Sequence, residues 1–205
     1  MKVFLSPTIT DDQVSRPLTF EQKVRLFHDR FHGWKFEIAH RMLEGYEAKD
    51  GTKIPPIPDA GFAAMDAMFS YFEPIGKYVH GYCDTYPKNT QSSGKYFKLG
   101  VQSVFPELDS HPDQVEVDTL LSLLWKGVRC GLYHAGKLHG KIAITGSILE
   151  PIRVDPQEKV MFINPHVLVL ALMDHLDNYR DCLLSEGPSS GWSQRFVARY
   201  DFDNA

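Results

Sequence analysis

Residues 19–46, TFEQKVRLFHDRFHGWKFEIAHRMLEGY, decide the fold. The stretch opens on a capping box, because Thr19 is followed three residues later by Gln22 and each side chain can bond the other's backbone N–H. Apolar residues then recur every three or four positions, the period of one helix face: Phe20, Val24, Phe27, Phe31, Trp34, Ile38, Met42 and Tyr46. The spacing predicts one long helix with this stripe in the core and Gly33 as its only weak point.

The chain on either side of this helix divides at turn residues. Residues 1–18 are expected to form a loosely structured arm, and Asp50-Gly51 with the prolines after it a linker loop. Asp59 is placed to cap a second helix over residues 60–82, which Pro74 should break or kink after Phe72. Residues 83–94 read as a polar loop, and two further helices are expected over residues 95–105 and 115–133.

The hydrophobic period changes after the helix at 115–133. Residues 141–145 and 159–163 are expected to be short strands, with residues 152–154 between them. Asn164 and Pro165 form a good N-cap and first position for a last helix that runs to about Leu184. Residues 187–191 are rich in glycine and serine and indicate a hinge, and Trp192–Ala205 is expected to be an extended tail.

These elements predict a mainly α fold, an up-down helical bundle with a small β-hairpin before its last helix. The organisation is an N-terminal arm over residues 1–18, one helical domain over residues 19–186 and a C-terminal tail over residues 187–205. A chain of 205 residues is long enough for one sizeable domain of this kind.

Composition narrows the function classes. A net charge of −4 and a pI of about 6.1 argue against an extended DNA-coating protein but leave room for a focused nucleic-acid site. No apolar run reaches the roughly 18 residues that a membrane span needs, and the apolar patch at the N-terminus is too short for a signal peptide. Cys83, Cys130 and Cys182 have no metal-like spacing, so a cytoplasmic, reducing setting is expected.

The most informative local feature is a cationic stretch at residues 126–141, KGVRCGLYHAGKLHGK. It holds four positively charged residues, Lys126, Arg129, Lys137 and Lys141, together with two histidines. No Asp or Glu occurs anywhere in residues 119–149. A local cationic focus on an acidic protein indicates a site for an anion such as a phosphate.

Within this stretch, Arg129 and His134 have the chemistry for phosphodiester cleavage. An arginine can hold two phosphate oxygens and stabilise charge in the transition state, and an imidazole can take up and release protons near neutral pH. Five residues of an α-helix rotate about 140° net, so the two side chains converge only through the length of arginine, fraying at the helix end, or a symmetric dimer. Three glycines, Gly131, Gly136 and Gly140, favour fraying.

The phrase VRCGLYHAG, at the end of an amphipathic helix, resembles the R-x(4–6)-H motif of the HEPN superfamily (higher eukaryotes and prokaryotes nucleotide-binding). The order of helices over residues 19–184 is similar as well. The resemblance implies a helical homodimer with two motifs facing a cleft, and a metal-independent endoribonuclease or RNA-binding function, often as a toxin or defence effector with a protein partner such as an antitoxin. Arg129 would bind the scissile phosphate, His134 would assist attack by the RNA 2′-hydroxyl, and Lys126 and Tyr133 would contact the substrate.

One position departs from the motif. The residue after the arginine is often Asn, Asp or His in nuclease members, and here it is Cys130. The alternative is therefore a catalytically inactive HEPN-like module that binds a nucleotide or a partner protein. In that case Arg129 could be held in a structural ion pair by an acid of another helix, such as Asp174 or Glu44.

Other candidates are weaker. His28 and His32 have the spacing of a metal pair but no Glu between them, which favours a solvated or dimer-edge pair. His134 and His139 lack a third ligand, and Cys130 as a nucleophile would depend on His134 as its base. His175, beside Asp174, is expected on the helix surface. No metal and no cofactor is predicted.

Overall fold

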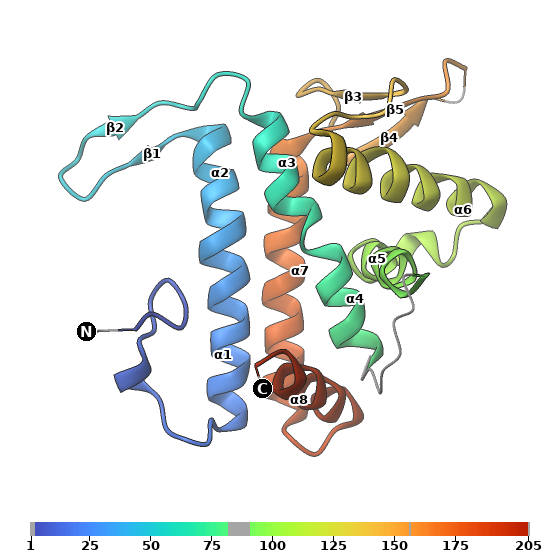
Figure 1. Ribbon diagram of the computed structural model, residues 1–205. Helices are drawn as coiled ribbons and strands as arrows, with labels where there is room; N and C mark the ends of the chain where they lie inside the picture. The colour runs from blue at the N-terminus through green and yellow to red at the C-terminus, as the bar shows by residue number, and fades with distance from the viewer. Residues whose placement is uncertain (1–2, 82–90, 156, 205) are drawn as a thin grey trace.

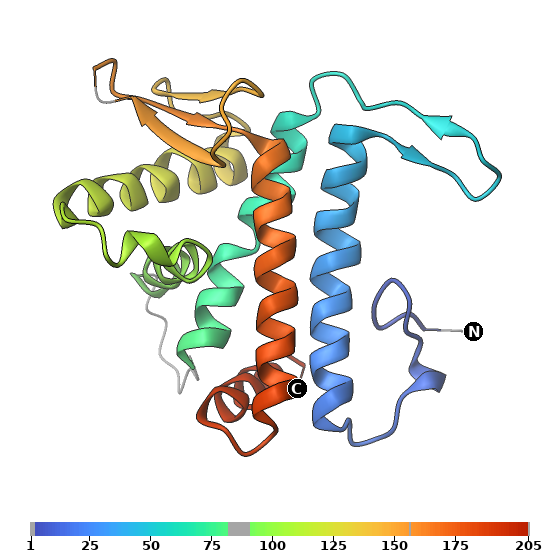
Figure 2. The ribbon, with the colours of Figure 1, turned by 180° about the vertical axis from the view of Figure 1, so that it is seen from behind.

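The computed structural model describes residues 3–81, 91–155 and 157–204. It is mainly helical, as predicted, and it has two small sheets in place of the single hairpin expected. Two long helical columns, α1 (Phe20–Phe31) with its continuation and α7 (Pro165–Glu186), run antiparallel and side by side (Figure 1). Helices α3 and α4 flank α7 on its other side, and α6 crosses near one end beside a three-stranded sheet, as the reverse view also shows (Figure 2).

The first column is continuous but not uniform. Helix α1 begins as predicted, because the Thr19 and Gln22 side chains each accept a hydrogen bond from the other's backbone N–H. It continues through the wider turn η2 (His32–Phe36), which is π-helical, into α2 (Glu37–Glu44). A π turn inserts one residue into the helix and so shifts every later side chain around the axis.

This shift changes which face is buried. Before η2 the predicted stripe holds, with Val24 and Phe27 in the core. After it, the stripe is wrong: Trp34 and Ile38 are 46% and 47% exposed, and the core positions are instead Phe36, Ala39 and Leu43. Phe31 and Phe36 are five residues apart, and a π turn, which is bonded from residue i to residue i+5, brings two such residues to nearly the same face.

The second helical segment is divided into α3 (Gly61–Phe69) and α4 (Phe72–His80). Pro74 lies in the first turn of α4, where a missing N–H is tolerated, and its ring prevents one helix from running through. The predicted break is confirmed, two residues earlier than expected. The predicted cap is wrong, because Ala60 is the N-cap and Asp59 adopts a left-handed φ of 59°.

Helix α5 (Gln91–Val104) starts earlier than expected, so residues 91–94 of the predicted loop are helical. The rest of that loop, residues 83–90, lies outside the described residues. The backbones of α4 and α5 touch at two glycines. A Cβ on Gly76 would lie 1.9 Å from the Tyr96 carbonyl oxygen, and one on Gly100 1.8 Å from that of Phe72. Any larger residue at either glycine would push the two helices apart.

The chain then turns through η3 (Pro106–Leu108) into α6 (Gln114–Leu123), which Asp113 caps. The expected core face is correct at Leu121, Val128 and Leu132, whereas Trp125 is half-buried against Phe97.

The strands differ from the predicted hairpin. β4 (Ile152–Asp155) and β5 (Val160–Ile163) do form an antiparallel pair, but β3 (Ile142–Ile144) adds a parallel strand on the far side of β5. The sheet is therefore mixed, in the order β3-β5-β4. A second antiparallel pair, β1 (Tyr46–Glu47) and β2 (Lys53–Ile54), forms an arm that projects from the body where a linker loop was expected (Figure 1).

The last predicted helix is confirmed. Asn164 caps α7 by accepting from the backbone N–H groups of His166 and Val167. The extended tail is wrong: residues after the hinge form α8 (Gly191–Asp203), which packs on α1 and α4 with Phe196 and Tyr200 buried. Within the described residues, no helix has both the length and the apolar character to cross a membrane.

The N-terminal arm is not loose either. Asp29 of α1 accepts hydrogen bonds from the Ser6 hydroxyl and from the backbone and hydroxyl of Thr8. Ile9 and Thr10 are buried, just before the short turn η1 (Asp11–Gln13). A periodicity analysis has no means of detecting this arm, because it is held by individual polar contacts.

Candidate functional site

The helix that carries the Arg129–His134 pair does not stay α-helical. From Leu124 it continues as two π segments, η4 (Leu124–Arg129) and η5 (Gly131–Ala135). In η4 the Cys130 N–H donates to the carbonyl five residues back, that of Trp125. The helix ends at Gly136, whose φ of 58° is a left-handed conformation that favours glycine.

This winding replaces the predicted fraying. In a helix bonded i to i+5, a residue five positions on is close to one complete turn away. Arg129 in η4 and His134 in η5 therefore lie nearer to one face than the 140° offset of an α-helix would place them. The glycines are compatible with an intact, widened helix end and not with a frayed one.

Arg129 lines a cavity of 190 Å³ at the meeting point of three irregular backbone segments. Lys35 comes from the π turn η2, Asp66 and Ser70 from the end of α3 where it breaks, and Arg129 and Tyr133 from η4 and η5. Phe69 and Leu132 complete the lining. π turns are frequent at functional sites, and here three of them, η2, η4 and η5, line one cavity.

The Arg129 guanidinium is held mainly by aromatic rings. Its central carbon lies 4.4 Å from the centre of the Tyr133 ring and 5.8 Å from that of Trp125. The nearest carboxylate in the described chain is Glu73, at 3.9 Å from one guanidinium nitrogen, which is beyond hydrogen-bond distance. The Arg129 side chain is 23% exposed, so solvent reaches it.

Glu73 forms hydrogen bonds with two other side chains. Its carboxylate accepts from the Lys77 ammonium at 2.6 Å and from the Ser93 hydroxyl at 2.9 Å. Burial alone would raise the pKa of Glu73, but the hydrogen bond and charge of Lys77, helped by Ser93 and Arg129, hold it below its ordinary value. Glu73 is therefore ionised at neutral pH, and it forms an ion pair with Arg129 at 3.9 Å in addition to its hydrogen bonds with Lys77 and Ser93.

The acids expected near Arg129 from sequence are elsewhere. Glu44 contacts His166 at 2.5 Å, at the far end of the first column, and Asp174 is exposed on α7. Neither of these two acids is a partner of Arg129; the ion pair with an acid of another helix, expected for the inactive module, is formed instead with Glu73 of α4.

The four predicted site residues are only partly brought together. Tyr133 is 69% exposed and lines the cavity with Arg129. His134 is exposed beside it, with its ring edge-on to the Tyr133 ring and 5.0 Å between centroids. Lys126 is exposed on η4 but does not line the cavity.

The His28–His32 pair has a structural explanation. The two rings stack at 5.5 Å, and the His28 Nε2 atom lies 2.7 Å from Asp177 and 3.0 Å from Arg180 on α7. Burial lowers the pKa of His28 more than the contact with Asp177 raises it. Among the described residues, no group of three His, Cys, Asp or Glu side chains could hold a metal ion.

His175 does not lie on the helix surface as predicted. Its two ring nitrogens each lie 3.0 Å from a hydroxyl, Nδ1 from Tyr71 and Nε2 from Ser103. These contacts tie α7 to α5 and to the break between α3 and α4. A serine beside a histidine can act as a nucleophile, but neither residue lines any of the cavities described here, so the cluster is a structural one.

The pH dependence of folding provides a test of this buried histidine. Burial lowers the pKa of His175 from 6.5 to about 4. The folded state therefore binds a proton at His175 only at lower pH than the unfolded state does. The stability contributed by the neutral His175 side chain is complete above pH 6.5 and is lost as the pH falls toward 4. We expect His175 to remove roughly 3 kcal/mol of stability between about pH 7 and pH 4. Urea unfolding at several pH values measures the free energy of unfolding of the wild type and of His175→Gln. The difference between the two proteins should change by this amount between about pH 7 and pH 4, and parallel curves of free energy against pH would contradict the prediction.

The sequence reasoning missed Lys35, Asp66, Ser70 and Glu73. A signal for Lys35 exists in the sequence: the apolar step from Phe31 to Phe36 is five residues, and Lys35 lies within it. The other three depend on how α3 and α4 pack against η4, which has no local signature.

Comparison with known proteins gives no family assignment. No family model matches the chain, and no curated protein or solved structure is significantly similar to it.

Proposed function

We propose that this protein is a HEPN-like metal-independent endoribonuclease or RNA-binding protein, with Arg129 and His134 at its site. One observation carries the proposal. Arg129 lines a cavity, lies against the Tyr133 and Trp125 rings, is 23% exposed, and meets its nearest carboxylate in the described chain, that of Glu73, as an ion pair at 3.9 Å without a hydrogen bond. An arginine placed in this way has its N–H groups available for a phosphate.

The surroundings of Arg129 suit a single RNA strand. Lys35 supplies a second cation to the same cavity and also lines a neighbouring cavity of 280 Å³ with Trp34. The exposed rings of Trp34 and Tyr133 thus accompany two cations. Exposed aromatic rings beside cations are the usual means of holding single-stranded nucleic acid, since bases stack on the rings and phosphates contact the cations.

The proposed reaction uses the RNA itself as nucleophile. The 2′-hydroxyl oxygen attacks the adjacent phosphorus while His134 accepts the hydroxyl proton, and Arg129 binds the phosphoryl oxygens as charge develops on them. The P–O5′ bond breaks, and the leaving 5′-oxygen takes up a proton. The products are a 2′,3′-cyclic phosphate and a 5′-hydroxyl, with no change in oxidation state. A two-fold dimer would supply the second proton carrier from the partner's copy of the site.

RNA binding is expected to depend on Arg129 and on salt. A fluorescent single-stranded RNA should bind the wild type with an affinity that falls as salt rises, because phosphate contacts release counterions. Arg129→Ala should weaken binding across sequences and reduce the slope of log affinity against log salt by about 1. Fluorescence anisotropy at several salt concentrations measures both.

The control is Arg153→Ala, which removes an exposed arginine of β4 that does not line the cavity and should leave the affinity near that of the wild type. Equal affinity of wild type and Arg129→Ala, or no binding by either, would favour the inactive interaction module instead. Light scattering on the same samples tests the dimer, since a mass near 23.4 kDa would be that of a single chain.

A further inference from the structure

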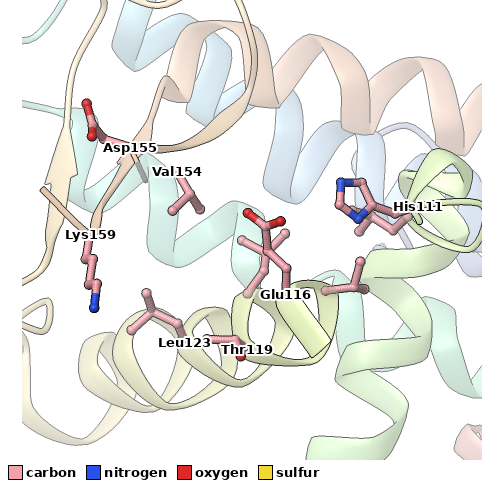
Figure 3. Close-up of a pocket in the computed structure, with 10 residues that line it drawn as sticks. His111, Glu116, Thr119, Leu123, Val154, Asp155 and Lys159 are labelled. Atoms are coloured by element: carbon pink, nitrogen blue, oxygen red, sulfur yellow. The ribbon is translucent and has the colours of Figure 1, made fainter. Parts of the chain in front are cut away.

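A larger groove lies away from Arg129, between α6 and the β4–β5 pair. It encloses 470 Å³, and Figure 3 shows Val154 of β4 and Glu116 of α6 pointing into it from opposite sides. A second hollow of 240 Å³ adjoins it and shares Leu108, Leu120 and Val154 with it. The floor of this combined groove is apolar, with further contributions from Val117, Leu123, Phe105 and Ile152.

One wall of the groove is an unpaired strand edge. β4 is the outer strand of the β3-β5-β4 sheet, and its register pairs Arg153 with Phe162 and Asp155 with Val160. In β5, Met161 and Ile163 bond toward β3, so Val160 and Phe162 bond toward β4. The backbone N–H and C=O groups of Ile152 and Val154 therefore face outward. Among the hydrogen bonds between described residues, none uses these groups.

The rim of the groove is acidic. Glu107, Glu116, Glu150 and Asp155 line it, against Lys159 as the one lysine or arginine in its described lining. The sequence has the same bias, because no Lys or Arg occurs between Lys98 and Lys126. Asp113 is accounted for as the cap of α6, but Glu107 and Glu150 have no such structural role.

We propose that this groove binds an extended, basic segment of a partner protein by strand addition to β4. The outward N–H and C=O groups of Ile152 and Val154 would pair with the backbone of the segment. Side chains of an added strand alternate between the two faces of the sheet, so one alternate set, if apolar, would enter the groove. Lysines or arginines at the ends of the segment would meet the acidic rim.

The charge of the groove distinguishes this occupant from a second copy of the chain. Pairing of two β4 edges would place two acidic rims against each other, and like charges in close contact oppose association. A basic segment of another protein meets no such repulsion.

A peptide titration tests the proposal. The probe is a fluorescent peptide of about eight residues with valine at alternate central positions and lysines at both ends, and its binding is followed by anisotropy. Saturable binding is expected, and it should be lost when glutamate replaces lysine or serine replaces valine. An added strand bonds through every second amide only, so N-methylation of one alternate set of amides should abolish binding while methylation of the other set leaves it. Equal effects of the two sets would overturn strand addition.

Variants locate the binding to the groove. Glu116→Lys combined with Glu150→Lys should weaken the peptide about tenfold or more, whereas Glu158→Lys, an exposed acid outside the lining, should change the affinity little. Val154→Pro removes an outward N–H without removing a bond to β5 and should also abolish binding. Unchanged affinity in both groove variants, with normal folding by circular dichroism, would overturn the proposal. Dimers that the wild type forms through β4, lost in Val154→Pro, would identify a second copy as the occupant instead.

Discussion

Replacing His134 with alanine is expected to slow RNA cleavage by at least about a hundredfold, the usual contribution of a general acid or base. The reaction should proceed in EDTA, since the proposed chemistry uses only Arg129, His134 and the RNA. The measurement is single-turnover cleavage of a labelled RNA, with the product ends identified as 2′,3′-cyclic phosphate by their resistance to phosphatase before acid treatment. This size of effect corresponds to about 2.7 kcal/mol in the activation barrier.

His139→Ala is the matched control. His139 is also an exposed histidine of the cationic stretch, and like His134 it does not line the Arg129 cavity, but only His134 is in ring contact with Tyr133, which does. Its replacement should leave the rate within a few-fold of the wild type. Unchanged cleavage by a folded His134→Ala protein would assign the activity to another site, and binding without cleavage in the wild type would reduce the proposal to its RNA-binding part.

Replacing Phe36 with alanine is expected to cost about 3–5 kcal/mol of folding free energy, the range for a buried phenylalanine. Phe36 is fully buried and packs edge-on against Tyr71 at 5.0 Å. Trp34→Ala removes a larger side chain from a position that is 46% exposed. It should cost much less, within about 1 kcal/mol. Chemical denaturation of both variants measures the difference.

The comparison tests the π turn itself. Without η2, the stripe of the first column would continue through Trp34 and Ile38, and the order of the two costs would reverse. A Trp34→Ala protein less stable than Phe36→Ala would show that the helix keeps its α-helical phase through residues 32–36.

The regular part of the fold could be predicted because its signals are local. The capping box at Thr19, the Asn164-Pro165 start of α7 and the Pro74 break each depend on residues within one turn of one another. The errors arise where tertiary contacts override a local pattern. The tail reads as polar and extended, yet α8 forms because Phe196 and Tyr200 bury against α1 and α4.

The candidate site shows the same division. Arg129 and Tyr133 could be selected from sequence, because a cationic stretch without acids is visible in one dimension. Their neighbour Lys35 lies almost a hundred residues earlier, and Glu73 approaches from a third helix. Only the packing of η2, α3 and η4 brings these groups together.

The column that starts at Gln114 and ends at Ala135 has carboxylates at its beginning and cations at its end. Its length is on the order of 30 Å, about four Debye lengths at physiological salt, so the charges at the two ends act on an approaching molecule separately. A polyanion would be drawn to one end and pushed from the other, which applies a torque to the protein before any contact forms. An RNA would therefore approach the cationic end of this column. The acidic groove would remain turned toward solvent and accessible to a second partner at the same time.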